Sequence, residues 1–135
     1  MTADVPIPSP IIKLMTVKVK DVLGNKNSTV KTDATITDAL VNMTSSGFGC
    51  VAVLDENNKL VGTFTDGDLR RLIEKEGEHA VTKKLSELSY NPPITIQGEE
   101  LLHRASEIFR ERGVDNLIVL NEDEVVGQID IQDLT

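Results

Sequence analysis

The stretch VGTFTDGDL at residues 61–69 decides how this chain folds, because it returns in outline as VGQIDIQDL at residues 126–134. The likeness extends far upstream of these two stretches. A shift of 66 residues pairs small and apolar positions, among them Val19 with Leu85, Ile36 with Leu102, Ala39 with Ala105, Gly47 with Gly113 and Val53 with Val119. An internal repeat of this kind predicts two copies of one structural unit.

The register between the copies changes by one residue in a polar turn. Residues 55–59 of the first copy correspond to the shorter stretch 121–124 of the second, and the shift is 65 residues from there on. Turns accept a change in length, whereas buried strands do not. The pattern therefore indicates a true duplication, and function is to be sought in what two similar units form together.

Composition limits the function classes that remain. The chain has 135 residues, which suits one compact module in which the two halves share one core. A net charge of -8 and 3% aromatic residues argue against nucleic acid as a partner. No apolar run approaches the roughly 20 residues that cross a membrane. Cys50 is the one cysteine, so we expect no internal disulfide and a cytoplasmic location.

Apolar periodicity predicts the order strand, helix, strand, strand, helix in each copy. In the first copy we expect these elements at 28–32, from Asp33 or Thr35 to Ser46, and at 51–54, 60–65 and 66–75. In the second we expect them at 94–97, 99–112, 117–120 and 125–129, with a last helix from about Asp130 that the chain end cuts short, as in a fragment.

The domain organisation follows from this order. We expect a lead-in at 1–16, a first repeat at 17–78 and a second repeat at 79–135. Three prolines make residues 1–10 an extended linker, and residues 11–15 are apolar enough to pack as a strand or turn.

The junction of strand and helix at residues 62–71 gathers polar groups. The first N–H groups of a helix attract an anion such as phosphate, and the Thr65 hydroxyl could add to that site. Asp68 has two acceptor oxygens that match the two hydroxyls of a ribose. The same spacing also predicts a capping box, in which Thr65 and Asp68 only cap the helix. Both interpretations can hold together.

The second copy has Asp130 where the first has Thr65. A carboxylate caps a helix well but repels a phosphate, so the two copies should not be equivalent. Arg70 and Arg71 could reach a phosphate, or could lie solvated on the helix surface.

Other reactive residues do not combine into a catalytic or metal-binding pattern. Cys50 fits a small core residue, and His79 and His103 have no second ligand at metal spacing. The sequence contains no Ser-His-Asp pattern and no glycine-rich phosphate loop. We therefore expect this chain not to be an enzyme by itself, with no metal site and no required cofactor.

With its two repeats, each containing Gly-x-x-(Thr/Asp)-x-x-Asp, the chain resembles a tandem pair of cystathionine-β-synthase (CBS) domains, the Bateman module, over residues 17–134. Residues 46–50 and 62–71 are most similar to the C-terminal regulatory region of arabinose-5-phosphate isomerases, enzymes of Kdo biosynthesis in carbohydrate metabolism. The resemblance implies an α+β fold, with two β-α-β-β-α repeats related by a pseudo-twofold axis. Their small mixed sheets would pack together with the helices outside, and the module would form a homodimer.

The resemblance also implies a ligand and its contacts. Clefts between such repeats bind nucleotides, here AMP, ATP or the nucleotide-sugar CMP-Kdo, and the module would regulate an isomerase domain that this chain lacks. By position, the implied ligand-binding residues are Thr32, Gly49, Cys50, Val51, Thr65, Asp68, Arg70, Asn116 and Asp133. The alternative is a dimerisation scaffold with empty clefts. A ligand that stabilises the protein would distinguish the two hypotheses.

Overall fold

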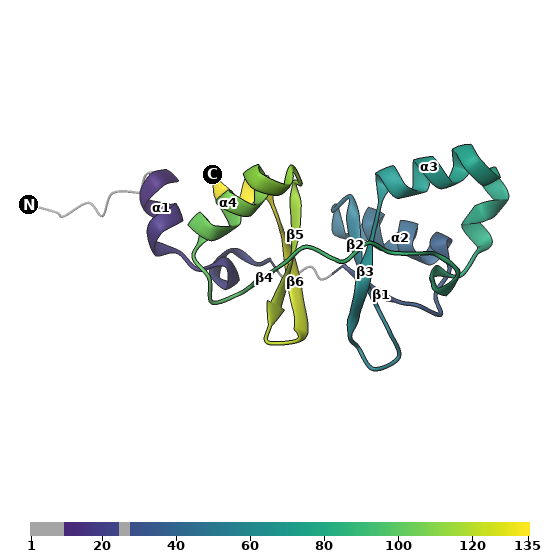
Figure 1. The fold of residues 1–135 in the computed structure, drawn as a ribbon, viewed down its shortest axis with the longest axis horizontal. Helices are drawn as coiled ribbons and strands as arrows, with labels where there is room; N and C mark the ends of the chain where they lie inside the picture. The colour runs from purple at the N-terminus through teal and green to yellow at the C-terminus, as the bar shows by residue number, and fades with distance from the viewer. Residues whose placement is uncertain (1–9, 25–27) are drawn as a thin grey trace, which may run out of the picture.

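Two small sheets pack face to face in the middle of the molecule, with the helices on the outer sides (Figure 1). The structure is a computed structural model and describes residues 10–24 and 28–135. Each sheet has three strands and mixes parallel with antiparallel pairing. The expected α+β architecture of two repeats is therefore confirmed.

The first repeat forms the sheet with strand order β1-β2-β3. Strand β1 is parallel to β2, and β2 is antiparallel to β3. Its elements are β1 (Thr29–Lys31), α2 (Ile36–Ser46), β2 (Cys50–Leu54), β3 (Leu60–Thr65) and α3 (Asp66–Glu76).

The second repeat forms the other sheet, with order β4-β5-β6 and the same pairing. Both sheets have a register irregularity at the equivalent place, after Val53 in β2 and after Val119 in β5. The elements are β4 (Thr95–Gln97), α4 (Leu102–Arg112), β5 (Asn116–Asn121) and β6 (Glu124–Asp130).

Local sequence explains where the helices begin and end. Helix α2 begins after Thr35, whose hydroxyl accepts a hydrogen bond from the Asp38 N–H at 3.2 Å. Helices α2 and α4 end at Gly47 and Gly113, which have φ values of +77° and +63°. Glycine adopts this left-handed backbone without a steric penalty, so both repeats end the helix in the same way.

Two expected elements are different in the structure. Residues 10–16 form a short helix, α1 (Pro10–Thr16), where we expected a strand or turn over 11–15. Proline suits the first position of a helix, and α1 packs against α4. The last helix is instead the 3₁₀ turn η4 (Ile131–Leu134), whose end is tied by the Thr135 N–H to the Gln132 carbonyl. The linker expected at 1–10 lies, except for Pro10, outside the described residues.

The expectation of one shared core holds only for a small cluster between the sheets, because each repeat also has a larger core of its own on the outer side of its sheet. One cluster of buried residues includes Ile36, Val51 and Phe64 of the first repeat. The other includes Leu102 and Ile129 of the second. The two faces of each sheet explain the arrangement, since a sheet buried on both sides packs against its helices on one face and against the partner sheet on the other.

Each core also contains a residue from the N-terminal segment of the opposite repeat. Val19, in the 3₁₀ turn η1 (Val19–Val22), is buried in the core of the second repeat, and its N–H donates to the Glu100 carbonyl. Leu85, in the 3₁₀ turn η3 (Leu85–Glu87), is buried in the core of the first repeat, and its N–H donates to the Ala34 carbonyl. This exchange ties the two halves together.

A third, smaller cluster lies between the two sheets. Its buried members are Cys50, Ala52, Ile118 and Val125. Gln128 is also buried there and donates from Nε2 to the Cys50 carbonyl at 3.1 Å. Over residues 10–24 and 28–135, no helix is long and apolar enough to cross a membrane.

Candidate ligand-binding cleft between the repeats

A cleft of about 850 Å³ opens where the two repeats meet. Both repeats and the segment that joins them contribute to its walls. The lining residues are 49–50, 63–68, 71–72, 75, 88–94, 113–116, 118 and 130.

The first turn of α3 forms the polar end of the cleft. The Asp68 N–H donates to Thr65 Oγ1 at 3.1 Å, and the Thr65 N–H donates to Asp68 Oδ2 at 3.0 Å. The predicted capping box is therefore confirmed. A hydroxyl that accepts a hydrogen bond still has its own hydrogen to donate, so capping does not exclude a contact between Thr65 and a ligand.

Arg71 covers this helix end. Its Nη2 donates to Asp68 Oδ1 at 2.7 Å, and its guanidinium lies where a side chain at position 67 would begin, with Nη1 3.2 Å from a Cβ built on Gly67. The side chain is 69% exposed, so the pair is weak and the guanidinium can turn to another anion. Arg70, the arginine chosen from the sequence, is exposed and does not line the cleft.

The segment between the repeats forms an apolar wall of the cleft. Residues 88–94 line it, and Tyr90 is anchored there by a hydrogen bond from its hydroxyl to the Leu85 carbonyl at 2.8 Å. Burial, and then the charge of Asp68, raise the pKa of the Tyr90 hydroxyl to about 12. No residue of this wall was predicted from the sequence. The pair Pro92 and Pro93 is the one signal for it, because it indicates an extended segment that could run along a cleft.

The second repeat contributes the opposite wall. Asn116 lies at the start of β5 and donates to Asp130 Oδ2 at 3.4 Å. The Asp130 N–H donates to Asp133 Oδ2 at 2.8 Å, which repeats the capping arrangement of the first repeat. Asp130 lines the cleft, and Asp133 does not.

The other residues chosen from the sequence fall into two groups. Gly49 and Cys50 line the cleft, and burial raises the pKa of the Cys50 thiol to about 12. Val51 points into the core of the first repeat and is fully buried, and Thr32 lies outside the lining. Of the nine residues, the structure brings together Gly49, Cys50, Thr65, Asp68 and Asn116 around one cleft.

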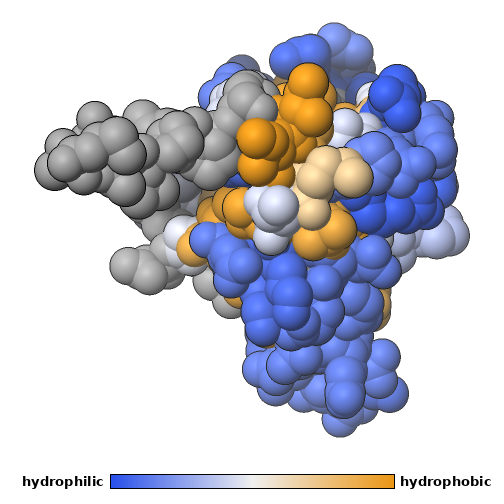
Figure 2. All heavy atoms as spheres, turned by 90° about the vertical axis from the view of Figure 1, so that its left-hand side faces the viewer, coloured by the Kyte–Doolittle hydropathy of each residue, from blue (hydrophilic) through white to orange (hydrophobic). Residues whose placement is uncertain are grey.

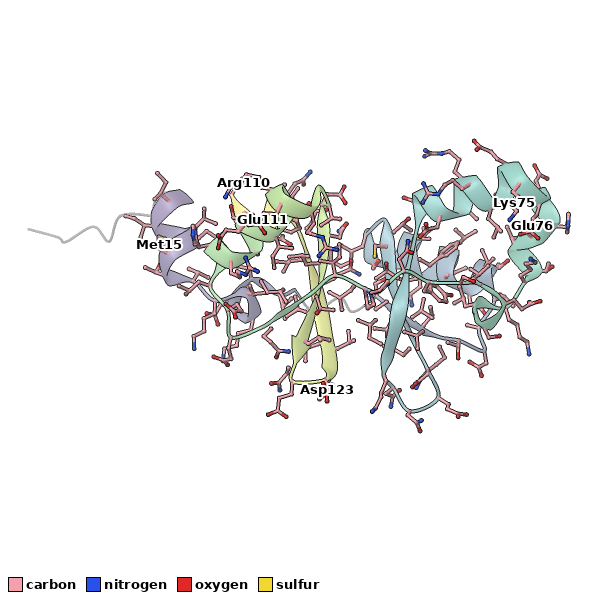
Figure 3. The ribbon with its side chains drawn as sticks, in the orientation of Figure 1. Met15, Lys75, Glu76, Arg110, Glu111 and Asp123 are labelled. Carbon is pink, nitrogen blue, oxygen red and sulfur yellow. The ribbon has the colours of Figure 1, made fainter. Side chains whose placement is uncertain are left out.

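The cleft is lined by more anionic than cationic side chains. Its lining contains the carboxylates of Asp66, Asp68, Asp115 and Asp130 against two cations, Arg71 and Lys75. Lys75 lies at the far end of α3, at the outer end of the first repeat (Figure 3). Among the described residues, no group of three or more His, Cys, Asp or Glu side chains could hold a metal ion.

The sequence matches the CBS domain family over residues 14–75 and 85–135. The chain belongs to the CBS domain family. This match covers both repeats, so the chain is a CBS domain pair.

Similar proteins extend this result. Arabinose 5-phosphate isomerase KdsD of Pseudomonas aeruginosa is 34% identical over 120 residues, which are 87% of this chain and 36% of that protein. A probable arabinose 5-phosphate isomerase of Haemophilus influenzae is 32% identical over 114 residues, 84% of this chain and 34% of its own length. The chain thus spans about a third of the curated relatives that it matches.

Solved structures support the fold. A CBS domain protein from Pyrobaculum aerophilum, in complex with AMP, superposes with a TM-score of 0.76 at 18% identity. The superposition covers 87% of this chain and 89% of that protein.

Proposed function

We propose that this CBS pair is the regulatory module of an arabinose-5-phosphate isomerase and senses a nucleotide or nucleotide-sugar in the cleft between its repeats. The observation that carries the proposal is the cleft itself, which has the first turn of α3, with Thr65 and Asp68, at one end and the apolar segment 88–94 along one side. The AMP-bound CBS protein of the same fold supports a nucleotide as the ligand class.

The proposed contacts follow from the groups present. A phosphate lies at the N-terminus of α3, where the backbone N–H groups and the helix dipole favour an anion, and the Thr65 hydroxyl donates to it. Asp68 accepts hydrogen bonds from the ribose hydroxyls. In the structure Arg71 pairs with Asp68. When the ribose binds to Asp68 it displaces the Arg71 guanidinium, which then turns toward the phosphate.

The candidate ligands are AMP, ATP and CMP-Kdo. The four carboxylates in the lining favour a ligand with one phosphate over ATP, because each further phosphate adds negative charge to a cleft with two cations. Ligand binding regulates the isomerase only if it favours one arrangement of the module over another. The proposal includes a cytoplasmic homodimer in Kdo biosynthesis, and no cofactor that the module requires.

A thermal-shift series with AMP, ADP, ATP, CMP and CMP-Kdo tests the proposal. A ligand at 100 times its dissociation constant adds about 2.7 kcal/mol to the free energy of unfolding. For a chain of this size, the melting temperature should then rise by roughly 8 °C. Melting temperatures that none of these compounds changes would overturn the proposal.

A second candidate function is a dimerisation scaffold, and one surface favours it. Ile11, Met15 and Ile131 are 74%, 55% and 44% exposed at the α1 end of the molecule. Apolar side chains gather on this face (Figure 2). Light scattering on the wild type and on Ile11→Ser/Met15→Ser would test it. The scaffold hypothesis predicts a dimer that the substitutions convert to monomer, in a protein that no nucleotide stabilises.

A further inference from the structure

We propose that Tyr90 is a stacking surface for a planar heteroaromatic ring, so that the cleft requires a ligand with a nucleobase and discriminates against a sugar phosphate alone. The inference rests on the proposed function and assigns the residue that recognises the base of its ligand. It concerns a residue of the connecting segment, outside the motif that carries Thr65 and Asp68.

The position of Tyr90 is fixed by two contacts. Its hydroxyl donates to the Leu85 carbonyl at 2.8 Å, and Leu85 is itself fully buried in the core of the first repeat. Its side chain lies against the backbone of Gly62, since a Cβ built on that glycine would be 2.6 Å from the Tyr90 Cγ. An aromatic ring held in this way loses little conformational entropy when a ligand binds, which favours affinity.

The surroundings of Tyr90 suit the flat face of a base. Leu88, Pro92 and Pro93 lie on the same segment and also line the cleft, and Ile118 of β5 lines it from the second repeat. Asp68 is near enough for its charge to raise the pKa of the Tyr90 hydroxyl. A nucleoside with its ribose at Asp68 therefore has its base within reach of this apolar wall.

The duplication places this aromatic wall in one half of the molecule. The shift of 66 residues pairs Tyr90 with Gly24, so the segment before the first repeat has no ring at the equivalent position. Tyr90 is also the single tyrosine of a chain without tryptophan. Intrinsic tyrosine fluorescence consequently reports on this one residue.

The test combines fluorescence with calorimetric titration. AMP, CMP and ribose 5-phosphate are titrated into the wild type, with fluorescence corrected for absorption by the nucleotide. We expect AMP or CMP to change the Tyr90 emission, and ribose 5-phosphate to bind at least fivefold more weakly than the better of the two. Stacking on an aromatic residue corresponds to roughly a five- to hundredfold gain in affinity.

Two substitutions complete the test. Tyr90→Phe keeps the ring and loses the hydroxyl contact to Leu85, and we expect its nucleotide affinity to stay within threefold of the wild type. Tyr90→Leu keeps an apolar side chain without the ring, and we expect at least a fivefold loss. Circular dichroism first establishes that both variants are folded. If Tyr90→Leu is not folded, the comparison of ribose 5-phosphate with the nucleotides on the wild type tests the stacking.

The outcomes separate this inference from the function on which it rests. Equal affinity for ribose 5-phosphate and the better-bound nucleotide, or full nucleotide affinity in Tyr90→Leu, would overturn the role of Tyr90 and leave the sensor intact. Nucleotide affinity lost in Tyr90→Phe would also contradict stacking. A wild type that binds none of the three compounds, and that none of the nucleotides in the thermal-shift series stabilises, overturns both.

Discussion

The two repeats share one fold and differ at residues in and near the cleft. At equivalent places in the sheets, the first repeat has Thr63 opposite Ala52 and the second has Gln128 opposite Ile118. Thr63 lines the cleft, whereas Gln128 is only 4% exposed and reaches across to the Cys50 carbonyl. The short side chain leaves space that the long one fills.

Two further differences also distinguish the first repeat from the second at the cleft. Thr65 can donate its hydroxyl hydrogen to an anion, whereas Asp130 at the equivalent position is a carboxylate already bonded to Asn116. Tyr90 corresponds to Gly24. The duplication thus preserved the packing, while a few side chains distinguish the two halves at the cleft. The comparison can be tested at the level of stability first and then at the level of binding.

The largest expected effect comes from the exchanged segments. Leu85→Ala should lower the free energy of unfolding by about 2–5 kcal/mol, because it leaves a cavity in the core of the first repeat. Urea denaturation measures the loss. Val41→Ala, at a 62% exposed position outside every proposed surface, is the control and should change stability by less than about 0.5 kcal/mol. A loss below 1 kcal/mol for Leu85→Ala would show that the segment does not hold the repeats together.

A smaller effect is expected at the two glycines that the repeats share. A Cβ on Gly62 would be 2.6 Å from the Cβ of Tyr90, so Gly62→Ala should cost about 1–3 kcal/mol. A Cβ on Gly127 would meet the flexible end of Leu23 at 3.2 Å, but the φ of +158° at Gly127 strains any other residue, so Gly127→Ala should also destabilise the protein. Gly24→Ala is the control, because a Cβ built there would have no other described residue within 4 Å apart from its chain neighbours. Thermal unfolding in which Gly62→Ala is no more damaging than Gly24→Ala would contradict this steric explanation.

The helix caps of the two repeats should also contribute unequally to stability, with the larger contribution in the first repeat. Thr65→Ala removes the cap of an eleven-residue helix and should cost about 1 kcal/mol. Asp130→Ala removes the cap of a four-residue 3₁₀ turn and should cost less. Chemical denaturation of both variants compares them, with Thr65→Ser as the variant that keeps the cap. Equal losses would mean that η4 contributes as much to stability as α3.

The smallest effect is electrostatic. Hydrogen bonds from Lys18 and Lys20 lower the pKa of the Glu99 carboxyl from its ordinary value of 4.5 to about 2. A lowered pKa in the folded state stabilises the protein above about pH 4.5, and this contribution is lost as the pH falls toward 2. Glu99→Gln should therefore melt slightly below the wild type at pH 6, with no difference at pH 2.

Salt provides the control for Glu99, because the pair is exposed and salt screens exposed charges. The difference between Glu99→Gln and the wild type should shrink at 1 M NaCl. A difference that persists at pH 2 or in high salt would mean that Glu99 acts through packing instead of charge.

Much of the fold could be predicted from the sequence, because the signals were local. The strand at 60–65 has the predicted bounds, and Gly47 and Gly113 end their helices as expected. The separate cores could not be predicted, because the repeat pairs Val19 with Leu85 as apolar positions but does not show against which repeat each one packs. The choice depends on the path of the segments that cross between the halves.

In the site, too, the residues that belong to a local motif could be predicted and the others could not. Thr65 and Asp68 belong to a motif at a helix start, where sequence spacing fixes geometry, and both line the cleft. Successive helix residues point about 100° apart, so spacing alone could not choose Arg71 over Arg70. Tyr90 was missed because it reaches the cleft from the connecting segment, at no position in the repeat that marks it.

In the proposed ligand site, the first repeat, and not the second, supplies the polar end of a single cleft. Calorimetric titration with AMP or CMP tests it directly, on the wild type, Asp68→Asn and Asp133→Asn. Asparagine keeps an oxygen for the capping contact in both repeats and removes only the charge. We predict one ligand per chain, with affinity at least tenfold weaker in Asp68→Asn and unchanged in Asp133→Asn. Two ligands per chain, or a loss confined to Asp133→Asn, would contradict it.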